Sequence, residues 1–450
     1  MSTKAFFCLL LGVGLSQVCC QATALTQPLR GKLERIDITG ITFTNPDYIR
    51  SRLNLAVSDV IDPALLEEAL RLLETDPIFR KVRGKLEPGS TSGSVVLKVE
   101  VEEANQIGGS VSLDNYSPPA LGSERLGVGL QIRNFSGNGD ILSASYFTTI
   151  GGGSNIYDFN YSIPVSPLQG TVSIRYAPSN FRIIQEPLKV FNFQGNAGLL
   201  EVSYRQPLVR NLHEEFALSL TYSYQTGQTF IDNFAFPFSI GPDSEGRATT
   251  SVFRFGQDYL SRDVSGAWSL KSSFNLGTGL FGGTFITVPN AGFFSWNGQV
   301  QRIQSVGADA FLIGSLDAQL SANPLLSSQQ FVVGGANSVR GFRQNVRAGD
   351  NGIRASVEGR FTVLRNQSAD RRAIIQLAPF VDVGAIWNNG QNPNPLPSQN
   401  FLAGGGLGII IEPVQNLLLR VDATIPFVNL ADRGNNLQES SVFFNIGYRF

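Results

Sequence analysis

The chain has 450 residues, of which 42% are hydrophobic and only 16% are charged, against about 25% charged residues in an ordinary soluble domain. Lysine and arginine total 35 and aspartate and glutamate total 36, so the chain lacks the basic field of a nucleic-acid-binding protein. Its apolar content excludes a disordered protein. After the N-terminus no apolar run reaches the length of about 18 residues that a membrane helix needs. The 47 glycines and 32 phenylalanines favour many β-strands instead.

The first 24 residues have the features of a secretory signal peptide. Lys4 precedes an apolar stretch over residues 5–15, and Ala22-Thr23-Ala24 provides a small-residue cleavage site. Cleavage after Ala24 would remove all three cysteines of the chain. Lipid modification of Cys19 or Cys20 is the alternative, and Val18 suits it poorly.

The mature chain lacks the side chains on which most catalytic and metal sites depend. Without cysteine it has no disulfide, thiolate metal site or cysteine nucleophile. The single histidine, His213, lies in a polar turn between two apparent strands, so a Ser-His-Asp triad has no histidine in a suitable place. We therefore expect no enzymatic activity, no catalytic residue, no cofactor and no metal.

Residues 31–104 have the pattern of a small α/β domain. Asn45-Pro46 and Asp62-Pro63 each supply a capping side chain followed by a proline suited to the first turn of a helix. Alternating strands flank the helices, and a turn rich in glycine and serine joins the last two strands. The expected elements are a strand at 33–41, helices that begin at Pro46 and Pro63, and strands at 81–87 and 95–103. We expect the two helices to cover one face of a three-stranded sheet.

From residue 107 to Phe450 the pattern changes to segments of about ten residues that alternate apolar and polar side chains. About sixteen such segments predict a transmembrane barrel of antiparallel strands with an apolar outer face and a polar lumen. A soluble sandwich also alternates, but no second core is available here to cover the apolar face. Short turns alternate with long loops at 177–195, 228–247, 279–294, 322–352 and 388–400. The short turns should face the periplasm, which places the small domain there.

One long loop differs from the others in its sequence. Residues 334–352 carry several arginines, including Arg340, which follows Val339 and precedes Gly341 and Phe342. One interpretation is an ordinary solvated surface loop. The other is a loop that folds into the lumen, where Arg340 would need a buried carboxylate partner. By strand parity Asp382 and Glu358 both face the lumen, and a forked pair with Asp382 is the first choice, with Glu358 in reserve.

Several motifs together resemble the two-partner secretion transporters, the haemolysin secretion/activation family. The small domain is similar to a POTRA domain, and residues 113–116 and 134–140 are similar to the start of that family's barrel. Residues 338–342, 380–384 and the terminal Phe450 match the family's Val-Arg-Gly-Phe loop motif, its Phe-x-Asp-x-Gly strand motif and its terminal aromatic. The two internal motifs are shared with the wider superfamily of outer-membrane assembly proteins.

The resemblance implies a sixteen-stranded barrel that exports one large partner exoprotein as an unfolded client, without ATP. It also implies that Arg340 pairs with Asp382 inside the lumen and that Phe450 is the signal read by the outer-membrane assembly machinery. We expect one POTRA-like domain here, whereas the family typically has two and a plug helix. The expected location is the outer membrane of a Gram-negative cell, with the lipid bilayer as a further partner. An outer-membrane insertase is the alternative function, and a passive pore is a weaker one.

Overall fold

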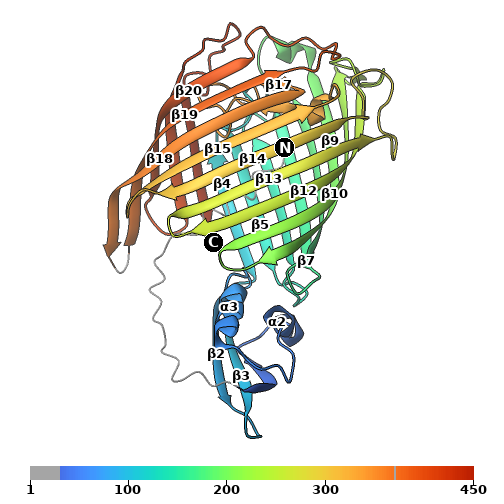
Figure 1. Ribbon diagram of the computed structural model, residues 1–450. Helices are drawn as coiled ribbons and strands as arrows, with labels where there is room; N and C mark the ends of the chain where they lie inside the picture. Colours follow the sequence, from blue (N-terminus) through green and yellow to red (C-terminus); the bar gives the residue numbers. More distant parts are fainter. Residues whose placement is uncertain (1–30, 369–370) are drawn as a thin grey trace.

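The computed structural model describes residues 31–368 and 371–450, so the expected signal peptide with its three cysteines lies outside the described residues. A small domain is attached to one end of a closed barrel (Figure 1). Within the described ranges, no helix combines the length and the hydropathy needed to cross a membrane.

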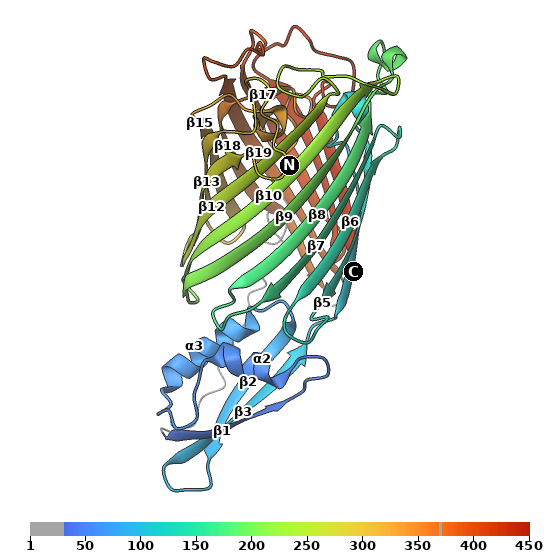
Figure 2. The same ribbon diagram turned by 90° about the vertical axis from the view of Figure 1, so that its right-hand side faces the viewer.

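The small domain contains three strands and two helices. Its elements are β1 (Lys32–Thr39), α2 (Pro46–Leu53), α3 (Pro63–Glu74), β2 (Phe79–Pro88) and β3 (Ser94–Glu103). The sheet order is β1-β3-β2, with β1 parallel and β2 antiparallel to β3. Both helices begin where their caps predict: the Asn45 side chain accepts from the amide of Asp47 at 3.0 Å, and that of Asp62 accepts from the amide of Ala64 at 2.9 Å. The helices lie on one side of the sheet (Figure 2), and apolar side chains from both layers form the core.

In the part of the chain that the structure describes, sixteen main strands form the barrel. They are β4 (Ile107–Asp114), β5 (Arg125–Arg133), β6 (Ile141–Thr149), β7 (Ser154–Pro164), β8 (Thr171–Arg182), β9 (Phe193–Arg210), β10 (Glu214–Ile231), β12 (Arg247–Asp263), β13 (Gly266–Thr278), β14 (Phe294–Ser305), β15 (Ala310–Ser321), β18 (Asn351–Ser368), β19 (Arg371–Trp387), β20 (Phe401–Glu412), β21 (Leu417–Pro426) and β22 (Val442–Arg449). Each pairs antiparallel with its neighbours, and β22 pairs with β4 to close the cylinder. The expected barrel of about sixteen antiparallel strands is confirmed.

Smaller elements lie in the long loops. Strand β11 (Phe234–Ala235) pairs with the end of β10, and β16 (Phe331–Val333) pairs with β17 (Arg347–Gly349). Three short 3-10 helices are η1 (Pro119–Leu121), η2 (Leu188–Phe191) and η3 (Ser327–Gln329).

Alternate side chains of each strand face opposite sides of the barrel wall. On β21, Val421 and Ile425 are exposed on the outer surface, whereas Asp422 and Thr424 are buried on the lumen side. An apolar exterior with a polar interior is the arrangement that a bilayer requires of a barrel.

The seam between β22 and β4 has a short ladder of five residue pairs, from Asn445–Asp114 to Arg449–Ser110. Beyond it, the Asn115 side chain takes the place of a further rung. Its Oδ1 accepts from the amide of Phe444 at 2.9 Å, and its Nδ2 donates to the carbonyl of Val442 at 2.9 Å. The Asn115 side-chain amide therefore reinforces the closure at a point where its backbone makes one longer hydrogen bond, 3.3 Å, to the carbonyl of Phe444.

The long loops lie at the barrel end opposite the small domain (Figures 1 and 2). The loop expected at 177–195 is shorter, because β8 continues to Arg182 and β9 begins at Phe193. Both ends of the expected loop belong to the ladder between β8 and β9, where Phe181 pairs with Gly195 and Pro178 pairs with Gly198. A further long loop, residues 427–441, was not among those expected.

The small domain contacts two short turns of the barrel, residues 134–140 and 165–170. The Asn134 side chain donates to Thr44 Oγ1 at 2.8 Å. The Gln169 side chain donates to Asp76 Oδ2 at 3.1 Å, and Asp76 also accepts a short hydrogen bond from the Tyr48 hydroxyl. Burial raises the pKa of the Asp76 carboxyl, since desolvation disfavours its charged form. The joint between domain and barrel is therefore polar and contains a buried acid.

Candidate functional site in the barrel lumen

The loop between β15 and β18 folds back into the barrel. Its β16–β17 hairpin contacts β18 and β19 of the barrel wall, and the segment between the two short strands carries the Val-Arg-Gly-Phe motif. Gly341 has a φ of +98°, a conformation that a residue with a Cβ rarely adopts, so glycine permits this turn. The loop therefore lies inside the lumen, as the second of the two interpretations expects.

Apolar contacts hold the folded-back loop. Val339 and Phe342 are 0% and 3% exposed, and they pack with Ile386 of β19 and Leu402 of β20. Burying side chains of this size contributes about 1.5–3 kcal/mol each. The two apolar residues of the motif thus bind the barrel wall on either side of the arginine.

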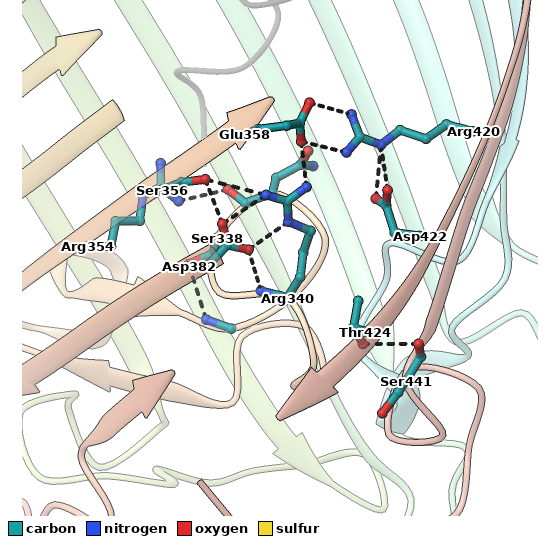
Figure 3. Close-up of polar contacts among 12 residues, drawn as sticks. Ser338, Arg340, Arg354, Ser356, Glu358, Asp382, Arg420, Asp422, Thr424 and Ser441 are labelled. Atoms are coloured by element: carbon teal, nitrogen blue, oxygen red, sulfur yellow. Dashed lines mark hydrogen bonds and ion pairs between the residues drawn. The ribbon is translucent and has the colours of Figure 1, made fainter. Parts of the chain in front are cut away.

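Arg340 makes a forked ion pair with Asp382 (Figure 3). Its Nε is 2.6 Å from Asp382 Oδ2, and its Nη2 is 2.8 Å from Asp382 Oδ1. The backbone amide of Arg340 also donates to Asp382 Oδ2, at 3.1 Å, and the Ser356 hydroxyl donates to Oδ1, at 2.6 Å. Asp382 is fully buried, so its charge depends on these donors.

Arg340 binds Glu358 at the same time. Its Nη1 lies 2.6 Å from Glu358 Oε2, on the side of the guanidinium that Asp382 does not use. Both expected partners, Asp382 as first choice and Glu358 in reserve, bind Arg340 together, because the planar guanidinium has enough donors for two carboxylates. The guanidinium carbon also lies 3.3 Å from the centroid of the Phe380 ring, a cation–π contact.

Glu358 connects this pair to a larger network. Arg420 of β21 donates to Glu358 Oε2 at 2.7 Å and to Asp422 at 2.9 Å (Figure 3). Arg360 donates to Glu358 Oε1 at 2.8 Å. Arg340, Arg360 and Arg420 thus surround Glu358. Their positive charges balance the carboxylates that strands β18, β19 and β21 place on one side of the lumen. The network therefore fixes the loop to several strands of the wall at once.

A second set of ion pairs fastens the same loop near the long-loop end. Arg343 binds Asp432 at 2.6 Å and Glu439 at 2.7 Å, and the buried Arg347 binds Asp432 at 2.9 Å. Hydrogen bonds from these arginines hold the pKa of Asp432 well below its ordinary value. The loop at 427–441 is thereby tied to the folded-back loop.

The structure brings Arg340, Asp382 and Glu358 together, whereas Phe450 lies apart from them. Phe450 exchanges two backbone hydrogen bonds with Gly109 at the seam, 2.9 and 3.0 Å long, and its ring stacks on Tyr448. Sequence reasoning missed the roles of Arg420 and Phe380, although Arg420 has the lumen-facing parity of Asp422 on β21 and Phe380 has that of Asp382 on β19.

The closed barrel, its apolar exterior and a charged lumen with a loop folded into it define an outer-membrane β-barrel protein. Residues 93–411 match the family described as haemolysin secretion/activation protein ShlB/FhaC/HecB. The outer membrane transporter CdiB of Dickeya dadantii (strain 3937) is 23% identical over 401 residues, which cover 85% of this chain and 67% of that protein. The chain belongs to the haemolysin secretion/activation protein family of two-partner secretion, and it is an outer-membrane transporter rather than an enzyme.

Solved structures share the fold. CdiB from Escherichia coli superposes with a TM-score of 0.78 at 18% identity, covering 94% of this chain and 77% of that one. CdiB from Acinetobacter baumannii gives 0.71 at 18% identity, with 94% and 74% covered. BamA from Haemophilus ducreyi lacking POTRA domains 1-3 gives 0.63 at 13% identity, with 93% and 85% covered.

Proposed function

We propose that this transporter exports an unfolded partner exoprotein through its barrel without ATP. The observation that carries the proposal is the loop clamped inside the lumen by Arg340, Asp382 and Glu358. A passive solute pore also needs no small domain with free sheet edges that could receive an extended polypeptide. The sequence contains no glycine-rich loop followed by Lys-Ser or Lys-Thr, so it offers no nucleotide site of the P-loop type to drive transport.

The clamp would hold the loop in place until the client arrives. A buried ion pair is strongly destabilised when one partner is removed, but both partners can separate together if water and the client's polar backbone replace their contacts. The lumen supplies further charges of both signs, which can hydrate an extended chain. Arg340 and its two carboxylates are thus proposed as a positioning site for the loop.

The small domain is proposed to be POTRA-like and to lie in the periplasm, where it captures the client. In its sheet β1 and β2 are the two outer strands, since β3 lies between them. An extended polypeptide can add to such an edge through backbone hydrogen bonds, which suits clients of varied sequence. Phe450, at the end of the last strand, is proposed as the signal for the outer-membrane assembly machinery.

The test is secretion by a host without a related system. The first step is to search beside the gene for a large secreted protein with a two-partner secretion domain. The chain is then expressed with that candidate client, and the culture medium is assayed for the client. Secretion that requires both proteins supports export, whereas retention of the partner in the periplasm contradicts it. If the chain instead restores barrel assembly in cells depleted of their own insertase, the insertase alternative replaces the proposal.

A further inference from the structure

Four phenylalanines form a connected cluster at the long-loop end of the barrel, which we name the aromatic rim: Phe191, Phe193, Phe236 and Phe238. The ring centroids of Phe193 and Phe238 are 5.0 Å apart, those of Phe191 and Phe193 are 5.5 Å apart, and those of Phe236 and Phe238 are 5.9 Å apart. Phe191, Phe236 and Phe238 are nevertheless 52%, 45% and 44% exposed. An apolar cluster that folding leaves this open is a candidate interaction surface.

The rim is held in place by its backbone. The Phe236 amide donates to the carbonyl of Thr229 on β10 at 3.0 Å. Further along the same loop, Ile240 exchanges two hydrogen bonds of 3.1 Å with the Asn394 side chain, which belongs to the loop before β20. The aromatic side chains are therefore displayed on an anchored loop.

Strand parity places the base of the rim on the lumen side. Phe193 shares its face of β9 with Glu201 and Arg205, and Glu201 pairs with Arg175 inside the barrel. The opposite face of β9 carries the exposed Leu200 and Val202 of the outer surface. The rim is thus continuous with the lumen wall, not with the apolar belt that faces lipid.

A second group of aromatic side chains shows the contrast. Phe281, which is 74% exposed, packs its ring against Tyr222 at 5.8 Å, and Tyr222 shares the outer face of β10 with the exposed Leu220. That position suits the aromatic girdle that barrels place at the edge of the membrane. Between the outer belt and the rim, the outer face of β9 carries Asn196 and Gly198.

The rim's two segments, residues 188–193 and 234–242, contain a single charged residue, Lys189. Whatever leaves the lumen on this side meets an anchored aromatic surface with almost no charge. Aromatic rings bind the apolar side chains of an extended strand, and contacts between aromatic and β-branched side chains stabilise paired strands.

We propose that the aromatic rim is the docking surface for the exported polypeptide as it emerges, still extended, from the lumen. This inference rests on the proposed export function. It adds an exit site on the outer side of the membrane. The rim would hold apolar segments of the client until enough chain has emerged to fold.

The experiment uses a jammed complex in the full-length transporter. The amino-terminal part of the candidate client is fused to a stably folded domain that cannot pass the barrel. A photo-reactive phenylalanine analogue replaces Phe238 in the rim, Phe281 in the outer belt, or Leu199 on the lumen face of β9. We expect the client to crosslink from positions 238 and 199, and lipid alone to crosslink from position 281.

The outcomes separate the two proposals. Crosslinks at position 199 without any at position 238 would contradict the docking role of the aromatic rim and leave the export proposal intact. A secretion-competent client that never crosslinks at position 199 would contradict export through the barrel. Lipid adducts or adducts between two transporter copies at 238 also overturn the rim and identify its true occupant.

Secretion kinetics provide a second measurement. The matched control uses Phe281 and Phe285, which is 52% exposed in the same loop between β13 and β14. The Phe236→Ser/Phe238→Ser variant should release the client several-fold more slowly than the Phe281→Ser/Phe285→Ser variant, at equal amounts of folded barrel. Equal rates for the two variants would remove the docking role.

Discussion

At the residue scale, Arg340 combines a forked pair, a second carboxylate and an aromatic ring around one guanidinium. Arg340→Lys keeps the charge but cannot reproduce the planar fork, so Asp382 would lose one of its two side-chain donors from this residue. Breaking a buried pair costs about 3–5 kcal/mol when one charge is left unpaired. We expect the variant to insert normally and to lose most of its secretion, as measured by client in the medium.

The control is Arg302→Lys, because Arg302 also pairs with a carboxylate, Asp263, but does not touch the loop. It should secrete normally. The alanine variants of Arg340 and Asp382 should combine less than additively, since each removes the same pair. Purely additive defects would show that the two residues do not act together.

Phe450 has two separable features at this scale: its place at the chain end and its backbone pairing with Gly109. Deletion of Phe450 removes both and should sharply lower the amount of transporter in the outer membrane. Phe427→Ala removes an exposed ring of the outer surface and should have little effect. Membrane fractionation measures both, and equal losses would reduce Phe450 to an ordinary lipid contact.

At the element scale, the joint between α2, α3 and the turn at 165–170 should respond to pH. Burial raises the pKa of Asp76, so the docked state favours its protonated form. The hydrogen bonds from the Tyr48 hydroxyl and the Ile78 amide, and the charges of Arg52 and Arg210, act in the opposite direction. Docking should strengthen as pH falls from neutral through that raised pKa, and it should weaken as pH rises through it. Amide exchange in the turn, slower at lower pH after correction for the intrinsic rate, is the measurement.

Asp76→Asn should abolish this pH dependence, because it cannot ionise. The matched variant is Asp59→Asn in the same domain, where the carboxylate accepts from the amide of Ala56 and lies away from the joint. If amide exchange in the turn depends on pH equally in both variants, the titrating group is not Asp76.

Much of the element scale could be predicted from sequence. Alternation of apolar and polar residues predicts both a strand and which of its side chains face the lumen. It therefore places Glu358 and Asp382 on the lumen side. Caps and prolines gave both helix starts. Strand ends near glycines such as Gly195 could not be predicted, since pairing with β8 decides whether such a segment is strand or loop. That Arg340 binds two carboxylates at once could not be predicted either. It depends on how deeply the loop enters the lumen, and no local sequence pattern encodes that depth.

At the scale of the whole molecule, the two faces of the wall should differ in what reaches them. A cysteine at Leu419 or Val442 should react with lipid-phase probes only, because both positions share the outer faces of their strands with exposed apolar residues. A cysteine at Asn445, on the lumen face of β22, is the control and should react with aqueous reagents. Aqueous labelling at positions 419 or 442 would contradict a membrane-embedded barrel.

Removal of residues 31–104 should separate the barrel from client capture. The barrel has a complete ladder of strands without the small domain, so the shortened chain should still insert. It should secrete nothing, if the domain is what receives the client. Continued secretion by this variant would leave the domain only a supporting role at the barrel mouth.

The seam between β22 and β4 has a consequence for how the molecule is made. It joins the two ends of the barrel sequence, and its Asn115–Val442 contact spans 327 positions of the chain. Because the last strand is synthesised last, every earlier stage of synthesis has two unpaired sheet edges, which are templates for aggregation. Bringing these two ends together costs chain entropy before any of the five residue pairs can form. The barrel is therefore expected to close in one late step after the whole chain has been delivered, and to need protection of its edges until then.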